Sequence, residues 1–167
     1  MPTPRFLLRG ALVVALASLG ACSSMRGPAS LPPGATIADA RQTFGGASGE
    51  YALPSGGTRL EFRQGRATQM LDFDASGRLV SSQQVLNPQT FATITPGMTQ
   101  EQVLARIGRP AFVFPVGWQQ LQVWNYRFGG MEGDCVVFQV SISNATRTVA
   151  DAGPNTDPAC DHGGDRN

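Results

Sequence analysis

The chain has 167 residues, a formal net charge of +1 and 41% hydrophobic residues, enough apolar material for one domain or two small ones. All 13 basic residues are arginine, which excludes a phosphate-binding lysine loop and Schiff-base chemistry. The near-neutral charge provides no basic face for nucleic acid, and the single histidine, His162, stands near the C-terminus, so we expect no nucleic-acid partner, no catalytic residues and no cofactor.

Residues 1–21 have the pattern of a secretory signal, with two arginines before the uncharged apolar run 10–17. The segment ends in Leu19-Gly20-Ala21-Cys22, which resembles the lipobox of bacterial lipoproteins. The resemblance implies that Cys22 is acylated and becomes the first residue of the mature protein. The alternatives are an ordinary signal peptide and a short transmembrane helix, but the apolar run is shorter than the ~18–20 residues that span a bilayer.

Residues 22–33 are small, polar and rich in proline, which predicts a tether between the lipid anchor and a folded domain. Ser23 follows the cysteine, where bacteria that sort lipoproteins by this position use aspartate to retain them at the inner membrane. The sequence therefore predicts an outer-membrane protein on the periplasmic face, held in the lipid through Cys22.

The remaining chain repeats a short motif, which divides it into a first module at 34–86 and a second at 87–151. In both copies a P-G-x-T stretch precedes a helical pattern that ends at glycine nine residues after the threonine. Thr36 and Thr99 are the predicted N-caps, and Gly45 and Gly108 the predicted stops. Only the second copy adds a hydrophobic staple and a proline after the stop, so we expect its helix to contribute more stability.

Antiparallel strands are predicted after each helix by alternation of apolar and polar residues. Between the modules, Asn87-Pro88 opens a short helical segment at 89–94, and residues 152–167 form a polar tail. The predicted fold is α+β: two tandem two-layer modules, each a short helix on a three- to four-stranded meander. The clearest strands are at 59–63, 71–73, 78–86, 124–128, 136–142 and 147–150.

The second module resembles the BamE family, also called SmpA/OmlA, small lipoproteins of the machinery that assembles β-barrels in the Gram-negative outer membrane. The resemblance covers residues 87–150 well and 33–86 weakly. Its elements stand in the family's order as GMT-x-x-x-V, G-x-P and W-x-Y-x-F. The residues that carry them are Gly97, Met98, Thr99, Val103, Gly108, Pro110, Trp124, Tyr126 and Phe128.

The resemblance implies a non-catalytic scaffold in barrel assembly or envelope maintenance, with membrane lipid and other envelope proteins as partners. This chain departs from the family in having two modules. A tandem pair is similar in architecture to the secreted β-lactamase inhibitory proteins, which grip an enzyme with a concave sheet. A periplasmic inhibitor or protein-binding module is therefore the alternative function, because a shared fold does not fix a function.

Cys135 and Cys160 are predicted to form a disulfide, since the periplasm is oxidising and the two cysteines make an even pair. Two groups resemble metal sites, and we expect neither to bind a metal. Residues 72–77 match the first half of a calcium loop, but Gln83 replaces its closing glutamate. The tail carries donor groups on a loose segment: Asp157, Cys160, Asp161, His162 and Asp165.

Two sets of aromatic residues are candidates for binding a partner. Trp124, Tyr126 and Phe128 share one strand face, which is more often core than interface. Trp118 lies in a loop beside Gly117, where it is either an exposed contact for a partner or lipid or a lid folded over the core.

Overall fold

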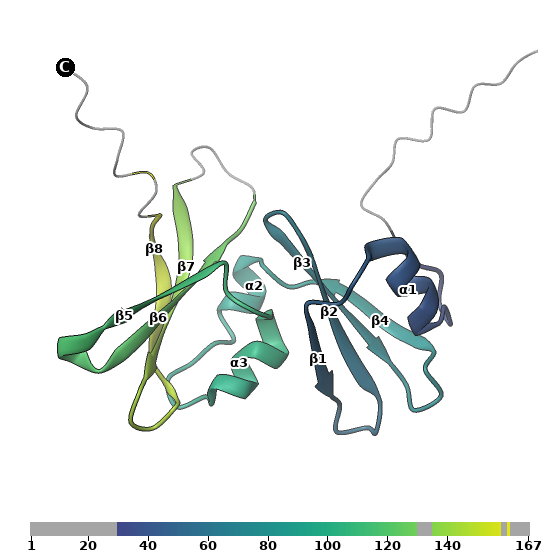
Figure 1. Cartoon of the computed structure of the whole chain (residues 1–167), viewed down its shortest axis with the longest axis horizontal. Helices are drawn as coiled ribbons and strands as arrows, with labels where there is room; N and C mark the ends of the chain where they lie inside the picture. Colours follow the sequence, from purple (N-terminus) through teal and green to yellow (C-terminus); the bar gives the residue numbers. More distant parts are fainter. Residues whose placement is uncertain (1–29, 130–134, 158–159, 161–167) are drawn as a thin grey trace, which may run out of the picture.

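The computed structural model describes residues 30–129, 135–157 and 160, and it contains two antiparallel sheets with short helices (Figure 1). The first sheet has the strand order β1-β2-β3-β4 and the second β5-β6-β7-β8. The fold is α+β, as predicted. The first group of elements is α1 (Ile37–Phe44), β1 (Gly49–Ala52), β2 (Thr58–Gln64), β3 (Ala67–Phe73) and β4 (Leu79–Gln84). The second is α2 (Pro88–Phe91), α3 (Gln100–Ile107), β5 (Phe112–Val116), the 3-10 turn η1 (Gly117–Gln119), β6 (Leu121–Arg127), β7 (Val136–Ser143) and β8 (Val149–Thr156).

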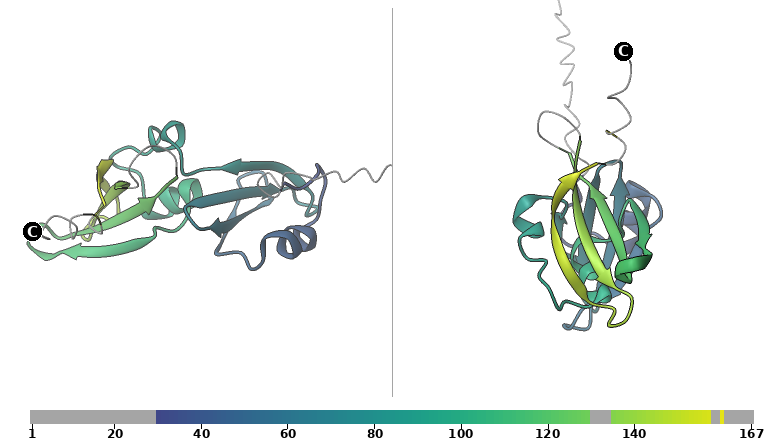
Figure 2. Two further views of the ribbon diagram at one scale, coloured as in Figure 1. Left: turned by 90° about the horizontal axis from the view of Figure 1, so that it is seen from above. Right: turned by 90° about the vertical axis from the view of Figure 1, so that its left-hand side faces the viewer.

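The elements stack in layers along the long axis of the molecule. From one end to the other these are α1, the first sheet, the pair α2 and α3, and the second sheet (Figures 1 and 2). The two sheets share no strand pair, so they do not form one continuous surface. Because α3 lies between them, the first sheet has a helix against each of its faces.

The first sheet and α1 enclose a small core. Ala40 on α1 is fully buried, and Phe44 packs its ring 5.3 Å from the ring of Phe62 on β2. The sheet contributes alternate residues of its strands, as expected for a half-buried meander. These are Leu60, Phe62, Leu71, Phe73 and Leu79.

The second core is larger and joins the two parts of the chain. Val103 and Ile107 on α3 pack on the buried face of the second sheet, which includes Trp124 and Tyr126. Phe91 on α2 stacks on Phe138 with ring centroids 4.2 Å apart. Met70 on β3 also belongs to this cluster, so a residue of the first sheet helps to close the core of the second.

Both eight-residue helices begin with a complete capping box. The Thr36 hydroxyl accepts a hydrogen bond from the Asp39 N–H, and the Thr99 hydroxyl accepts one from the Gln102 N–H, while the residue at each third position bonds back. The first box is therefore as complete as the second. In the part of the chain that is described, no helix combines the length and the apolar character needed to cross a membrane.

The structure contains two strands that the sequence patterns did not predict, β1 and β5. Strand β1 is only four residues long, and β5 contains Pro115, which weighs against a strand except at a sheet edge. The structure places both at sheet edges, so each sheet has four strands. The last strand also runs further than expected: β8 continues to Thr156, inside the segment that we predicted to be a polar tail.

Both edge strands of the second sheet carry a proline within the ladder. Pro115 on β5 is paired with Gln122, and Pro154 on β8 is paired with Phe138. Proline has no backbone N–H, so neither edge presents an unbroken row of donors to solvent.

Candidate functional site

The first sheet meets α3 through charged side chains on β2. Arg59 forms a two-pronged ion pair with Asp72 on β3, with N···O distances of 2.6 and 2.7 Å, and this hydrogen bonding raises the pKa of Arg59. The remaining terminal nitrogen of Arg59 donates to the Ala105 carbonyl in the last turn of α3, at 2.8 Å. A cation at this end of a helix is favoured by the helix dipole. Arg63 donates to the Pro110 carbonyl beyond the helix, at 2.9 Å.

Glu61 lies between the two arginines and is fully buried. Its carboxylate accepts hydrogen bonds from the Tyr51 hydroxyl at 2.8 Å and from the Arg109 backbone N–H at 3.1 Å. On the other side, the Tyr126 hydroxyl donates to the Gly108 carbonyl at 3.0 Å. Burial raises the pKa of both tyrosines above the ordinary value. The end of α3 is therefore held by polar groups from both sheets.

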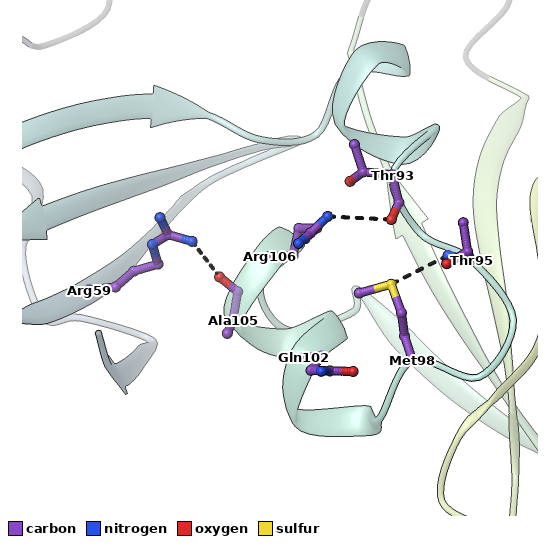
Figure 3. Close-up of a pocket in the computed structure, with 7 residues that line it drawn as sticks. All are labelled: Arg59, Thr93, Thr95, Met98, Gln102, Ala105 and Arg106. Carbon is purple, nitrogen blue, oxygen red and sulfur yellow. Dashed lines mark hydrogen bonds between the residues drawn. The ribbon is translucent and has the colours of Figure 1, made fainter. Parts of the chain in front are cut away.

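A groove lined by both polar and apolar side chains opens beside this contact, between the first sheet and the helices α2 and α3. It consists of two adjoining cavities of about 410 and 330 Å³, which share Arg59, Thr93 and Arg106 as lining residues. Figure 3 shows the larger cavity, with Arg59 on one wall and Arg106 approaching Thr93 near the other. We call these two cavities the inter-sheet groove.

Arg106 is the exposed cation of the inter-sheet groove. Its guanidinium makes one long hydrogen bond, 3.4 Å to the Thr93 carbonyl, and no ion pair with any residue in the described ranges. Arg59, by contrast, is already neutralised by Asp72. The groove therefore carries one uncompensated positive charge.

A second feature is the hairpin formed by β5, η1 and β6. It lies at the opposite end of the molecule from α1 (Figures 1 and 2). Trp118 in η1 has 84% of its surface exposed, so it does not fold over the core as a lid. An exposed tryptophan at a hairpin tip is suited to bind a partner through a large rigid surface.

The outer face of this hairpin is apolar beside the tryptophan. Phe114 pairs with Val123 and Val116 pairs with Leu121, and paired residues share a face. Phe114, Val116 and Leu121 are half-buried. The guanidinium carbon of Arg127 lies 4.8 Å from the ring centroid of Phe112 and covers part of this face. We call Phe112, Phe114, Val116, Trp118 and Leu121 the hairpin face.

An apolar slot of about 510 Å³ separates α2 from β8 on the other side of the second sheet. Phe91, Phe128 and Phe138 line it, and Pro154 stands at its outer wall. No charged residue is among its lining residues, so the slot is a place for apolar groups.

The residues of the BamE-like motif are structural in this molecule. Trp124 and Tyr126 are buried, Phe128 is half-buried, and Val103 is fully buried under them. Thr99 caps α3, and Gly108 ends it with a φ of +78°. The motif therefore shapes α3 and its seat on the second sheet, and leaves Trp118 exposed.

The structure joins Cys135 and Cys160 by a disulfide, with Cα atoms 5.6 Å apart. Asp157 lies between these two cysteines in the sequence. Its buried carboxylate forms an ion pair with Arg127 at 2.5 Å, and its backbone N–H donates to the Cys135 carbonyl. The bridge thus ties the end of β8 to the start of β7.

No group of three or more metal-ligating side chains comes together in the described part of the chain. Within the calcium-like stretch, Asp72 pairs with Arg59, and Asp74 accepts hydrogen bonds from the backbone N–H groups of Ser76 and Arg78. The carboxylates are therefore used in an ion pair and a turn. Cys22 and the tail residues Asp161, His162 and Asp165 lie outside the described residues.

Sequence reasoning missed the residues that form the inter-sheet groove. No functional role was predicted from the sequence for Arg59, Glu61 or Arg106. The signal that was available is the density of charge on one strand, Arg59, Glu61 and Arg63, on the face opposite the apolar core. A free strand face seldom needs a carboxylate flanked by two arginines.

One known protein family matches part of the chain. Residues 84–136 match the family model of the outer membrane protein assembly factor BamE domain. The match confirms the resemblance noted for the second module, and it spans α2, α3, β5 and β6. The chain is therefore similar, over less than half of its length, to the BamE domain of outer membrane protein assembly factors.

Similarity to other proteins is low. No curated protein matches the sequence. A candidate beta-lactamase inhibitor protein from Streptococcus mutans is 8% identical with a TM-score of 0.34, covering 72% of this chain and 82% of that one. A cysteine-rich secretory protein from Staphylococcus aureus is 14% identical with a TM-score of 0.28, covering 76% of this chain and 45% of that one. TM-scores this low carry no argument about architecture or function.

Proposed function

We propose that the protein is a lipid-anchored, non-catalytic accessory factor in outer-membrane β-barrel assembly or envelope maintenance, attached through acylated Cys22 and facing the periplasm. The observation that carries this proposal is the BamE-domain match at residues 84–136. The lipobox-like ending at Cys22 supports it independently, because members of that family are lipoproteins.

The proposed organisation is a signal peptide at 1–21, a tether at 22–33, a degenerate BamE-like module at 34–86 and a second module at 87–151. Its support is the repeated order of a capped helix followed by a four-stranded antiparallel meander. In each copy the helix ends at a glycine with positive φ, Gly45 at +87° and Gly108 at +78°. The strand β8 extends the second module to Thr156.

The hairpin face is the proposed contact for a partner protein. The described chain begins beside α1, and the hairpin lies at the other end of the molecule (Figure 1). A tether that leaves near α1 would therefore present Trp118 at the end away from the anchor. The matched BamE domain contains this hairpin, which connects the proposed contact to the proposed role.

The test is affinity purification of the full lipidated chain from detergent-solubilised outer membranes, followed by identification of co-purifying proteins. Recovery of barrel-assembly components supports the proposal, and recovery of a single soluble hydrolase favours the inhibitor alternative. A Cys22→Ser variant serves as control, since it should leave an uncleaved or soluble form that is absent from the outer-membrane fraction while the folded part is unchanged. If that variant still fractionates with outer membranes as a processed protein, the anchor at Cys22 is wrong.

The inhibitor alternative gains no support from the arrangement of the two sheets. Gripping an enzyme with a concave sheet requires a continuous surface across both modules. Here α2 and α3 lie between the sheets, and no strand pair joins them (Figure 1).

A further inference from the structure

We propose that the inter-sheet groove binds an extended, acidic peptide segment of a partner protein, with Arg106 as the residue that recognises a carboxylate. The proposal does not depend on the role in barrel assembly, because it concerns only the chemistry of the groove. The proposed site is formed jointly by the first sheet and α3, at the place where they pack together.

The groove is elongated and built from both halves of the chain. Its two cavities meet at Arg59, Thr93 and Arg106 and continue on either side of them. One extends along α3 toward Gln102, and the other extends toward Gln83 on β4 and Gln89 on α2. Figure 3 shows the cavity on the α3 side, with Arg106 near the middle of the lining residues. A single small anion would fill only the centre of this space.

The charge of the groove selects an anionic occupant. Arg106 lacks an ion-pair partner among the described residues, and its bond to the Thr93 carbonyl is long at 3.4 Å. Arg59 is fixed by Asp72 and by the Ala105 carbonyl, so it forms a rigid, neutralised wall. An incoming carboxylate therefore meets one available guanidinium, whose planar donors match its two oxygens.

The remaining polar groups favour a peptide over a phosphate. The amides of Gln83 and Gln89 make no hydrogen bond in the described structure, and each offers an acceptor as well as a donor. A phosphodiester group supplies acceptors only and leaves these carbonyl oxygens unused, whereas a peptide backbone supplies both N–H and C=O groups. The Gln102 oxygen is engaged by the Thr99 N–H, so this residue presents its NH₂ group as a donor. The groove therefore offers both donors and acceptors, with which a peptide backbone can form hydrogen bonds.

The experiment measures binding of two fluorescently labelled peptides to the purified full chain in detergent. One peptide consists of Gly, Ser and Glu, and the other has Gln in place of every Glu. Arg106→Gln is the test variant. Arg41→Gln is the matched control, because Arg41 is the basic residue in the last turn of α1 as Arg106 is in that of α3, and both changes remove one charge.

We expect the Glu peptide to bind the unchanged chain and the Arg41→Gln variant equally, and the Arg106→Gln variant roughly tenfold more weakly, as for one charge-assisted hydrogen bond. Amide resonances of Thr93 and Gln102 should shift on titration with the Glu peptide and stay in place with the Gln peptide. Equal binding by both variants, or no preference for Glu over Gln, overturns the proposal. Binding of anionic phospholipid vesicles through Arg106 without binding of the Glu peptide also overturns it, and assigns the groove to a membrane surface.

Discussion

The buried carboxylate of Glu61 on β2 accepts a hydrogen bond from the backbone N–H of Arg109, the second residue after α3. A strand of the first sheet therefore holds the end of a helix that packs on the second sheet. The same carboxylate accepts the Tyr51 hydroxyl, so one side chain satisfies donors from both halves of the molecule. Apolar contact also joins the two halves, because Met70, Val85 and Leu86 belong to the larger core.

The first prediction concerns the removal of this acceptor. Glu61→Ala leaves two part-buried hydrogen bonds, from the Tyr51 hydroxyl and the Arg109 N–H, without their acceptor, and should lower the free energy of unfolding by about 1 kcal/mol for each. Glu61→Gln keeps one acceptor oxygen and should cost less. Urea denaturation of both variants measures the difference. An alanine variant as stable as the unchanged chain would show that the Glu61 hydrogen bonds do not stabilise the fold.

The same site predicts a loss of stability at high pH. The pKa values of Tyr51 and Tyr126 are raised in the folded state, first by burial and then, for Tyr51, by the hydrogen bond to Glu61. The unfolded chain then loses these protons first, as pH rises above about 10, and the folded state is destabilised from there upward. Glu61→Gln should lower the pKa of Tyr51, which a spectrophotometric titration of the tyrosines detects.

The second prediction uses the glycines that end the two helices. Both combine positive φ with extended ψ, a region essentially confined to glycine, so alanine at either one costs roughly 1–3 kcal/mol in backbone strain. A Cβ at Gly108 would also come within 2.8 Å of the Glu61 carboxyl carbon, whereas a Cβ at Gly45 would have nothing within 4 Å. Gly108→Ala should therefore destabilise the protein clearly more than Gly45→Ala. Equal losses in denaturant titrations would contradict the close approach of Glu61.

Sequence reasoning succeeded where local chemistry decides the structure. The caps at Thr36 and Thr99 and the stops at Gly45 and Gly108 were predicted from residue type and spacing, because a helix end is satisfied by its own neighbours. The strands with clear alternation were also predicted, among them β2, β6 and β7.

Sequence reasoning failed where the structure depends on contacts between distant segments. Strand β5 contains Pro115, and only its place at a sheet edge makes that proline acceptable. Glu61 alternates with apolar residues as an exposed strand position would, yet α3 covers that face. The groove residues Arg59 and Arg106 are 47 positions apart in sequence, and no local pattern links them.

The third prediction compares the two capping boxes. Thr99→Ala should cost roughly 1 kcal/mol, and Thr36→Ala should cost no more, because α1 covers the smaller core. The third residues of the two boxes, Asp39 and Gln102, should differ in their response to acid. The backbone hydrogen bond from Thr36 lowers the pKa of Asp39, so the contribution of that carboxylate is lost as pH falls below its unfolded value, about 4. Gln102 does not titrate, and thermal melts of Asp39→Asn and Gln102→Ala across acidic pH separate the two cases.

The fourth prediction distinguishes the hairpin face from the buried aromatics. Trp118→Ala should weaken association with the partner or membrane while the melting temperature stays nearly unchanged, since the side chain is exposed. Trp124→Ala should cost roughly 3–5 kcal/mol and lose binding only through unfolding. Thermal melts and co-purification of both variants decide this, and a folded Trp124→Ala variant that no longer binds would make the strand face the interface.

The fifth prediction concerns the disulfide. Thiol titration of the unfolded, unreduced mature protein should find no free cysteine, because Cys135 and Cys160 are bridged and the proposed anchor blocks the Cys22 thiol. A paired Cys135→Ser and Cys160→Ser variant should lose about 3–4 kcal/mol of stability, from a loop of 25 residues in the chain-entropy model. Two titratable thiols in the mature protein would contradict the bridge.

The prolines in the two edge strands of the second sheet limit how the backbone of another chain can pair with that sheet. An open sheet edge can recruit an unfolded strand into a lengthening ladder. At Pro115 and Pro154 an added strand would meet a position without an N–H donor, which interrupts the hydrogen bonding. We therefore expect the edges of the second sheet to be poor templates for strands of other chains.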